Sequence, residues 1–309
     1  LVGSEMCIRD RLYKLKNTYL DPLPSYIVAD TKRVHSSFNQ TMTATGRLST
    51  SSPNFQNIPI RTEDGKEIRK AIKAQSNEYQ IFSADYSQVE LRVMAHLSGD
   101  ESLISALNNG EDIHTFTAKN IFNVDNDDMV LPEMRRIAKI VNFGIMYGAG
   151  PFRLSQELDI PFGEAKQIKD AYFEKYQGIE QYIENSKLQI KETKSVETLL
   201  GRKRAVWDSD SQNKIRRDAA ERMAINMPIQ GTAAEMIKLA MIKIHRQMNK
   251  ENLKSKLIMQ IHDELLLEVH QDEIDYISKM VIEHMRNAMK LDVPIEIDFG
   301  IGPSWYEAH

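Results

Sequence analysis

The sequence predicts an α+β fold, in which strand-forming and helix-forming segments occupy different parts of the chain. Short apolar runs within residues 81–84, 257–269 and 295–301 are too short for helices and are typical of strands. Residues 101–200, by contrast, repeat apolar side chains at helical spacing with only short breaks. The chain has 309 residues, of which 41% are hydrophobic and 27% charged, a profile typical of a globular protein.

Hydropathy, cysteine content and net charge argue against a membrane protein, a secreted protein and a disulfide-bonded protein. No apolar run reaches the ~20 residues needed to span a membrane, and no secretory signal is evident. The single cysteine, Cys7, rules out an internal disulfide and suits a reducing compartment. A formal charge of −4 argues against coating nucleic acid by bulk charge, yet it is compatible with a local basic groove beside an acidic site. We therefore expect a cytoplasmic protein without a membrane partner.

The N-terminal part predicts little regular structure. Residues 1–11 lack a clear period, and we expect them to be non-native sequence that is excluded from reasoning about the fold. Residues 14–24 are polar and interrupted by proline, as expected for the remnant of an upstream element. Residues 28–60 predict short strands and turns, because prolines and amides oppose a long helix. This segment offers one Arg and side-chain amides, either as a solvated loop or as a binding segment.

Asp85 is expected at the end of a strand and the start of a helix. The apolar run 81–84 precedes it, and apolar residues recur at helical spacing after it. Ser87 and Glu90 have the spacing of a capping box, which predicts that the helix begins between them. A carboxylate at such a junction has a rigid mount from which it can face a cleft.

Residues 132–147 predict a helix that begins at Pro132 and ends before Gly148. Four side chains spaced four residues apart form one slowly drifting stripe on it: Arg135, Lys139, Phe143 and Tyr147. A stripe that is first cationic and then aromatic suits a ligand with phosphates at one end and a flat ring at the other. The alternative is a solvated basic face that leads into an aromatic core. His114 lies near another helix start, where a lone histidine is more often structural.

Residues 215–226 predict a helix rich in Arg and Ala. Pro228 is expected to kink or break it, and Thr232 with Glu235 has the spacing of a second capping box. Polar side chains repeat every four residues along this stretch: Arg222, Asn226 and Gln230. Donors at such intervals can reach the acceptors that all base pairs share in the minor groove. The basic turn 199–205 is either a phosphate-backbone contact or simply exposed.

Residues 257–269 predict a hairpin with His262, Asp263 and Glu264 at its tip. Two adjacent acids between apolar strands are costly to hold together unless they are solvated or bind cations. An ordinary hairpin turn would more typically use Gly or Asn. We therefore interpret this tip as a functional site.

Three of these stretches together resemble the signature motifs of family A DNA polymerases. They are DYSQVELR at 85–92, RRIAKIVNFGIMYG at 135–148 and HDE at 262–264. TGRLS with PNFQNIP, and ERMAINMPIQGTAA, are also similar to that family, and the five motifs stand in the family's order. The resemblance extends from about Leu15 to His309.

The resemblance implies a right-hand polymerase fold. An antiparallel-sheet palm is expected at 28–98 and 208–309, with mostly helical fingers at 99–207. The thumb would lie within and before residues 1–27, so we expect it to be largely missing. Exonuclease domains that usually precede it are absent from this stretch.

The resemblance also implies template-directed DNA synthesis, with Asp85 and Asp263 holding two Mg²⁺ ions. Glu264 would be an accessory acid. Arg135, Lys139 and His114 would bind the triphosphate, with Gln88 nearby in the substrate site, and Lys139 would also be catalytic. Phe143 and Tyr147 would pack on the incoming sugar and base, and Glu90 would exclude a 2′-hydroxyl. The minor groove of the newest base pairs would be lined by Arg47, Arg222, Asn226, Gln230 and His262. Asn54 and Gln56 would also bind DNA.

The implied partners are primer-template DNA and dNTPs, and the protein would act as a monomer in the bacterial cytoplasm, associated with the nucleoid. Three alternatives to this interpretation remain. A single-subunit RNA polymerase shares much of the motif set, but Glu90 argues for the DNA enzyme. A primer-template-binding fragment with weak or no activity would result if the missing thumb is essential. Five ordered motifs argue against a structural domain with coincidental matches.

Overall fold

The computed structural model describes residues 2–58 and 63–309, which form two compact units. The first comprises Leu1–Ser87, Ile237–Ala288 and Glu296–His309, and the second comprises Gln88–Met236 and Met289–Ile295. Pro59, which ends the predicted PNFQNIP segment, lies outside the described residues. The two units do not divide the chain at the expected palm and fingers bounds, which stay a prediction. The α+β fold class is confirmed.

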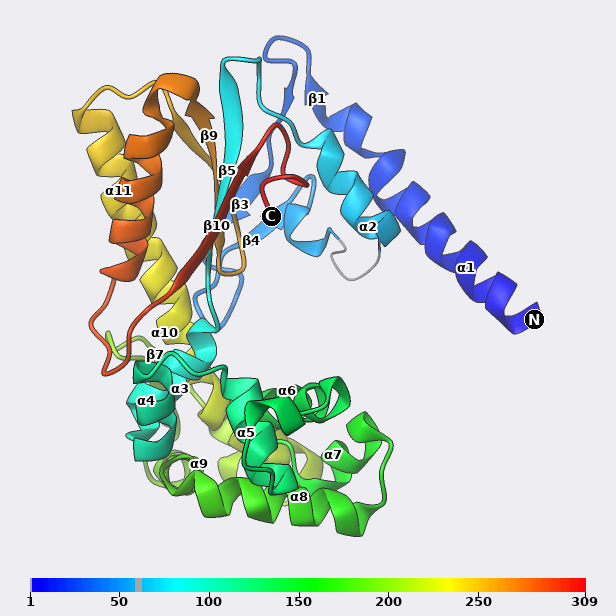
Figure 1. Cartoon of the computed structure of the whole chain (residues 1–309), viewed down its shortest axis with the longest axis vertical. Helices are drawn as coiled ribbons and strands as arrows, with labels where there is room; N and C mark the ends of the chain where they lie inside the picture. Colours follow the sequence, from blue (N-terminus) through cyan, green and yellow to red (C-terminus); the bar gives the residue numbers. More distant parts are fainter. Residues whose placement is uncertain (1, 59–62) are drawn as a thin grey trace. The chain divides into compact units, whose positions relative to one another are not determined.

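A four-stranded antiparallel sheet forms the centre of the first unit (Figure 1). Its spatial order is β10-β5-β9-β8. The strands span Tyr79–Tyr86 (β5), Lys256–Ile261 (β8), Glu264–His270 (β9) and Ile297–Gly302 (β10). The two central strands, β5 and β9, are mostly buried, which agrees with the apolar residues at their centres, IF in β5 and LLL in β9. The predicted strand, hairpin and last strand are confirmed.

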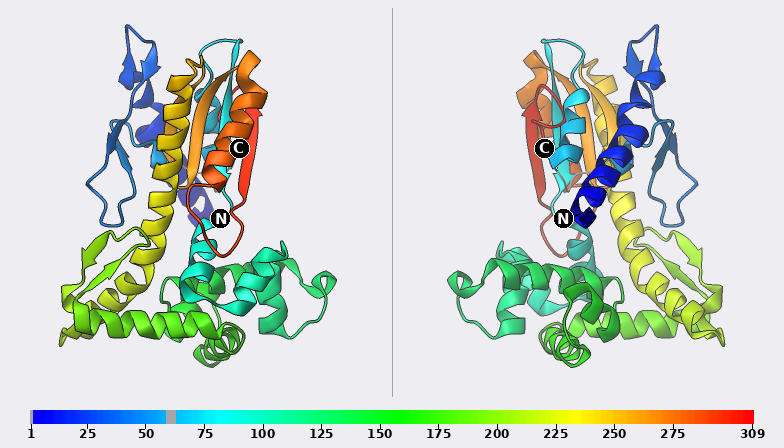
Figure 2. Two further views of the ribbon diagram at one scale, coloured as in Figure 1. Left: turned by 90° about the vertical axis from the view of Figure 1, so that its left-hand side faces the viewer. Right: turned by 90° about the vertical axis from the view of Figure 1, so that its right-hand side faces the viewer.

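Both faces of this sheet are covered (Figures 1 and 2). On one face, α11 (Ile274–Arg286) packs against β5, β9 and β10, and the Tyr86 hydroxyl donates to the Met285 carbonyl at 2.8 Å. On the other face, an apolar cluster joins the sheet to the N-terminal elements and includes Tyr19, Ile68 and Trp305. Burial of apolar area on both faces is the main contribution to the stability of this unit.

The remaining elements of the first unit are short. Two hairpins pair β1 (Ile27–Val28) with β2 (Arg33–Val34) and β3 (Ser37–Asn39) with β4 (Ser49–Ser51). These hairpins confirm the predicted short strands and turns. Helical segments flank them: α1 (Val2–Leu15), η1 (Lys16–Leu20), η2 (Leu23–Tyr26), η3 (Phe55–Asn57), α2 (Glu63–Glu67) and η4 (Ile68–Ala71). Residues 2–11, for which no regular structure was predicted, therefore form most of α1.

The second unit is mostly helical, as predicted for residues 101–200. Its helices are α3 (Val89–Ser98), α4 (Glu101–Asn108), α5 (Ile113–Phe122), α6 (Pro132–Met146), α7 (Pro151–Leu158), α8 (Phe162–Lys175) and α9 (Gln177–Thr193). Asp100 caps α4 by accepting from the Leu103 N–H, and it also accepts from the Gly178 N–H at 2.8 Å. A Cβ at Gly178 would lie 2.7 Å from the Asp100 Cα, so only glycine permits this approach.

The predicted capping box at Ser87 and Glu90 is wrong. Helix α3 begins at Val89 after Gln88, which adopts a left-handed conformation with φ of 51°, and no side chain caps it. Both supposed capping residues have tertiary partners instead. The Ser87 N–H donates to the Glu296 carbonyl at 3.0 Å, and the Glu90 carboxylate accepts from the Tyr147 hydroxyl.

Of the two alternatives predicted for Pro228, a break is wrong, because α10 runs from Lys214 to Lys250 with Pro228 inside it. A kink at Pro228 stays a prediction. Thr232 and Glu235 do not start a new helix. The Thr232 hydroxyl accepts from the Leu199 N–H at 3.2 Å, and Glu235 accepts from the Thr198 hydroxyl at 2.9 Å. Buried side chains on both sides of the proline outweigh its cost of roughly 3 kcal/mol. Neither α10 nor any other described helix is long and apolar enough to cross a membrane.

Candidate active site

Three carboxylates gather at one end of the sheet in the first unit. Asp85 is the penultimate residue of β5 and lies directly opposite Glu264, the first residue of β9. Asp263 is in the two-residue turn between β8 and β9, and its carbonyl accepts from the Tyr86 N–H at 3.2 Å. His262, with φ of 52°, makes the turn sharp enough to bring the hairpin tip to the end of β5. The sequence thus predicted correctly that both acidic stretches stand at strand ends.

The proximity of these acids perturbs Asp85. Its pKa is raised from 3.8 to about 7, first by burial and then by the charges of Asp263 and Glu264. Removing Asp85 from water and placing it beside like charges both disfavour the carboxylate form. A nearby cation would reverse this and favour the ionised form.

The pKa of Glu264 is shifted in the opposite direction, although Glu264 is also buried, with 5% of its surface exposed. Burial raises its pKa, but hydrogen bonds from His309, Ser83 and Trp305 outweigh burial and lower the pKa below the usual value. Glu264 therefore stays ionised, and its charge is directed into a set of protein donors. This distinguishes it from Asp85, whose pKa no such set of donors lowers.

Asp85 and Asp263 are the residues that could hold a metal. Among the described residues, no three His, Cys, Asp or Glu side chains are grouped as a metal site. Mg²⁺, however, is commonly bound through one or two carboxylates and completed by water and substrate phosphates. Asp85 and Asp263 fit such an ion. Burial and the neighbouring negative charges raise the pKa of Asp85, and a bound cation would offset both effects.

The cationic and aromatic stripe predicted on residues 132–147 is present in the second unit, on α6. The Arg135 guanidinium is paired with Asp112, the N-cap of α5, by bonds of 3.1 and 2.8 Å. Lys139 is exposed one turn later. At the end of the stripe, the rings of Phe143 and Tyr147 are stacked with centroids 6.3 Å apart.

The pKa values of Asp112 and His114, which lie beside this stripe, are both lowered. Burial raises the pKa of Asp112, but the hydrogen bonds from Arg135 and Thr115 outweigh it and lower the pKa to about 2. His114 is 3% exposed, and burial lowers its pKa to about 4, so the imidazole is neutral near pH 7. Its Nδ1 lies 3.1 Å from the Asn142 amide nitrogen, and its ring packs near Phe143. The structure thus places His114 beside the stripe but inside the core.

Helix α3 carries two more of the predicted residues. Gln88 is the left-handed residue before the helix, and Glu90 is buried in its first turn. The hydrogen bond from the Tyr147 hydroxyl to the Glu90 carboxylate connects α3 with the end of α6. Glu90 and Tyr147 belong to separate sequence motifs, and the tertiary structure brings them into contact.

The row on α10 belongs to the second unit as well. Arg222, Asn226 and Gln230 are half-buried, and the Asn226 side-chain oxygen is buried without a hydrogen-bond partner among the described residues. A buried acceptor without a partner is costly and is typical of a site that meets a ligand or water. The backbone beside Gly148 approaches this helix closely, since a Cβ there would lie 3.1 Å from the Arg222 Cγ.

The other predicted DNA-contacting residues lie in the first unit. The Asn54 side chain caps η3 and accepts from the Thr50 hydroxyl at 2.8 Å. Gln56 donates to the Leu48 carbonyl at 3.2 Å and to Gln260 at 3.4 Å, and Gln260 in turn donates to the His262 carbonyl. These bonds attach the segment to the hairpin that carries Asp263. Arg47 is half-buried in the same segment.

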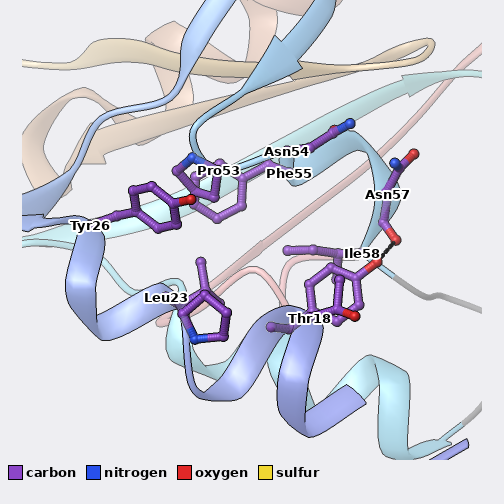
Figure 3. A pocket seen from close by; sticks show the side chains of 10 residues that line it. Thr18, Leu23, Tyr26, Pro53, Asn54, Phe55, Asn57 and Ile58 are labelled. Atoms are coloured by element: carbon purple, nitrogen blue, oxygen red, sulfur yellow. Dashed lines mark hydrogen bonds between the residues drawn. The ribbon is translucent and has the colours of Figure 1, made fainter. Parts of the chain in front are cut away.

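A cavity of about 100 Å³ lies elsewhere in the first unit (Figure 3). The Tyr19 hydroxyl donates to the Asn57 carbonyl there. The described residues that line the cavity are Thr18, Tyr19, Pro22, Leu23, Tyr26, Pro53, Asn54, Phe55, Asn57 and Ile58. No carboxylate, His, Lys or Arg is among the described residues that line it. The cavity is therefore separate from the acidic site.

Several residues of the site were not found from the sequence. Ser83, Trp305 and His309 contact Glu264, and Asp112 contacts Arg135. Ser83 and Trp305 lie 181 and 41 residues from Glu264, so no spacing pattern identifies them. Asp112 could have been found by its N-cap position, but its pairing with Arg135 could not.

Comparisons with known proteins agree with this geometry. The family model described as DNA polymerase family A matches residues 6–307. The chain is 50% identical over 297 residues to DNA polymerase I, thermostable, from Thermus filiformis, covering 96% of this chain and 35% of the relative. It is 48% identical over 295 residues to DNA polymerase I from Bacillus subtilis, covering 96% of this chain and 33% of the relative.

A solved structure is also similar. It is described as the POL domain of Pol1 from M. smegmatis in complex with DNA primer-template and dNTP, with a TM-score of 0.91 and 45% identity. The match covers 96% of this chain and 52% of that one. The chain spans about a third of the length of the curated relatives that it matches. On this evidence the chain belongs to DNA polymerase family A, whose members generally use divalent metal ions.

Proposed function

We propose that this chain is the polymerase part of a bacterial DNA polymerase I and adds dNTPs to a primer 3′-hydroxyl under the direction of a template strand. The observation that carries the proposal is the gathering of Asp85, Asp263 and Glu264 at one end of the sheet, within a chain that matches the family over residues 6–307. Nucleotidyl transfer depends mainly on positioning and on cationic stabilisation of the phosphoryl oxygens. A site of this kind needs carboxylates that hold metal ions.

Asp85 and Asp263 would hold two Mg²⁺ ions, which supply activation of the 3′-hydroxyl and stabilisation of the developing charge. The raised pKa of Asp85 supports this assignment, because the carboxylate needs a cation to ionise fully near pH 7. Glu264 keeps its charge through protein donors and serves as the accessory acid.

The nucleotide would be bound by the second unit. Arg135 and Lys139 would bind the triphosphate, and Lys139 would also assist its transfer. Arg135 would exchange its bond to Asp112 for a phosphate, since both partners are anionic and planar bidentate pairing suits either. His114 would bind the triphosphate as a neutral imidazole. Gln88, which precedes α3, would also belong to the nucleotide site. Phe143 and Tyr147 would receive the base and sugar, and Glu90 would exclude ribonucleotides.

Primer-template DNA would be contacted through the minor groove by Arg47, Arg222, Asn226, Gln230 and His262, and Asn54 and Gln56 would also bind DNA. The buried, unpartnered oxygen of Asn226 supports a contact at that position. The similar M. smegmatis structure is a complex with DNA primer-template and dNTP, which supports the same partners here. We further propose that the protein acts as a monomer in the cytoplasm, at the nucleoid.

The test is primer extension with a chimera in which this chain replaces the matching part of the Bacillus subtilis relative. Asp85→Asn and Asp263→Asn should abolish nucleotide addition while gel-shift binding to primer-template is retained, because each removes a metal-holding charge. Asp275→Asn is the control, since Asp275 is an exposed acid in the first turn of α11, and it should extend normally.

Two results would contradict the proposal. Extension at the wild-type rate by either variant would overturn the metal assignment. A wild-type chimera that binds primer-template but adds no nucleotide, under conditions in which the Bacillus subtilis protein does, would leave a DNA-binding module without activity.

A further inference from the structure

Residues 303–309 fold back against the sheet and reach Glu264. The Trp305 N–H donates to the Ile72 carbonyl at 2.9 Å, and the Ala74 N–H donates to the Pro303 carbonyl at 3.3 Å. The return is possible only because β10 carries glycines where it passes. A Cβ at Gly300 would lie 2.5 Å from the Ala308 carbonyl oxygen, and one at Gly302 would lie 2.6 Å from the Glu307 Cβ. The close contact is therefore built into the sequence of the strand.

The fold-back segment delivers a donor to one particular oxygen. The indole Nε1 of Trp305 donates to Glu264 Oε1 at 2.8 Å, and the Ser83 hydroxyl donates to the same oxygen at 2.6 Å. His309 Nδ1 lies 3.4 Å from that oxygen as well. Donors from two different segments on a single oxygen restrict rotation of the carboxylate.

Trp305 is itself held in place from its ring face. It is fully buried, and the Arg69 guanidinium carbon lies 3.9 Å from its ring centroid. Arg69 is 4% exposed, and its Nε has no hydrogen-bond partner among the described residues. A cation over the face of an indole ring is attracted to it, so the Trp305 ring helps to stabilise this buried charge. Its positive charge is also felt by Glu264 and Asp85.

We propose that residues 303–309 support the active-site carboxylates and that Trp305 is a positioning residue, which holds Glu264 through its indole N–H. The proposal rests on the proposed function, because it takes Asp85 and Asp263 as the metal-holding acids. Glu264 is adjacent to Asp263 in sequence and opposite Asp85 across the strands. Holding its carboxylate therefore fixes both a charge and a backbone position beside the two metal-holding side chains.

The test compares Trp305→Phe with three other variants in the same chimera. Phenylalanine keeps an aromatic ring under Arg69 and removes only the N–H donor and part of the bulk. Ser83→Ala removes the second donor by a small change. Trp207→Phe is the matched control, since Trp207 is 76% exposed, and Asp85→Asn reports on the metal site itself. Each variant is measured for single-turnover rate, dNTP KM, DNA affinity, melting temperature and Mn²⁺ binding by electron paramagnetic resonance without nucleotide.

We expect Trp305→Phe to lower the rate and the Mn²⁺ affinity by about 10-fold, the effect typical of a residue that orients a metal-holding group. Ser83→Ala should act in the same direction, dNTP KM and DNA affinity should change less than about twofold, and Trp207→Phe should match wild type.

Three outcomes would count against the inference. Wild-type rate and Mn²⁺ binding in Trp305→Phe, while Asp85→Asn is inactive, would overturn the role of Trp305 alone. A lowered melting temperature in Trp305→Phe with parallel losses of rate and DNA affinity, together with a normal Ser83→Ala, would make Trp305 an ordinary core residue. An active Asp85→Asn would overturn the proposed function instead.

Discussion

The Tyr147 hydroxyl donates a hydrogen bond to the Glu90 carboxylate and so joins the end of α6 to the first turn of α3. The two residues are 57 positions apart, and Glu90 is buried. The carboxylate is therefore aimed by a tertiary contact rather than by a helix cap. This bears directly on how the site would select its sugar.

Glu90→Ala should raise ribonucleotide incorporation, because removing the side chain leaves room for a 2′-hydroxyl. We expect the ratio of kcat/KM for dNTP over rNTP to fall by at least about tenfold, which corresponds to roughly 1.4 kcal/mol of discrimination. Tyr147→Phe, which only releases the carboxylate, should have a smaller effect in the same direction. Glu101→Ala, an exposed acid in the first turn of α4, is the control. An unchanged ratio with a lowered melting temperature would make Glu90 structural.

Lys139→Ala should weaken dNTP use far more than DNA binding. Lys139 is exposed one turn after Arg135, where a triphosphate would lie, and a charge-assisted hydrogen bond contributes about 1.5–3 kcal/mol. The dNTP KM or the single-turnover rate should therefore change about tenfold or more. Arg136→Ala serves as the comparison, because Arg136 is paired with Glu133 on the same helix. Lower DNA affinity with an unchanged nucleotide KM would identify α6 as a DNA contact.

Asp112→Asn should improve nucleotide binding. Asparagine keeps the N-cap of α5 but weakens the ion pair that occupies Arg135, and exposed ion pairs contribute roughly 0.2–1 kcal/mol. The dNTP KM should therefore fall by at most about fivefold. In an Arg135→Ala background the same substitution should have no effect. If it lowered the KM there too, Asp112 would act on the triphosphate directly.

The stability of the metal-free protein should depend on Asp85 between pH 4 and 7. The folded protein keeps a proton on Asp85 up to about pH 7, whereas the unfolded chain releases it near 3.8. A raised folded pKa stabilises the fold at low pH, and this contribution is lost as the pH rises through about 7. A difference of about three pKa units corresponds to at most about 4 kcal/mol.

Asp85→Asn should therefore melt above wild type at pH 8 with a chelator present, and the gap should shrink toward pH 5. Added Mg²⁺ should stabilise wild type more than the variant, because only wild type has both metal-holding charges. Asp275→Asn, at an exposed acid in the first turn of α11, should show neither effect. A gap that did not change with pH would contradict the perturbed titration of Asp85.

Local patterns in the sequence predicted the elements that carry the site. The apolar run 81–84, the paired runs around His262 and the Pro132 helix start all correspond to observed elements. These elements follow from interactions between residues close in sequence, which spacing and composition record. The same patterns placed the acids at strand ends and the cationic stripe on a helix.

Local patterns failed where distant partners compete for the same group. Ser87 and Glu90 have capping-box spacing, yet their partners are Glu296 and Tyr147. Pro228 is tolerated inside α10 because burial of its neighbours outweighs the lost backbone bond.

By itself, the sequence determined where the candidate residues stand: the acids at the strand ends, the cations and rings on α6, and the amides around Gln56. Only the tertiary structure decided their state. Burial and neighbouring charge raise the pKa of Asp85, Asp112 occupies Arg135, and Trp305 holds Glu264. Each of these depends on a distance between residues far apart in the chain, and such a distance is set by packing rather than by spacing.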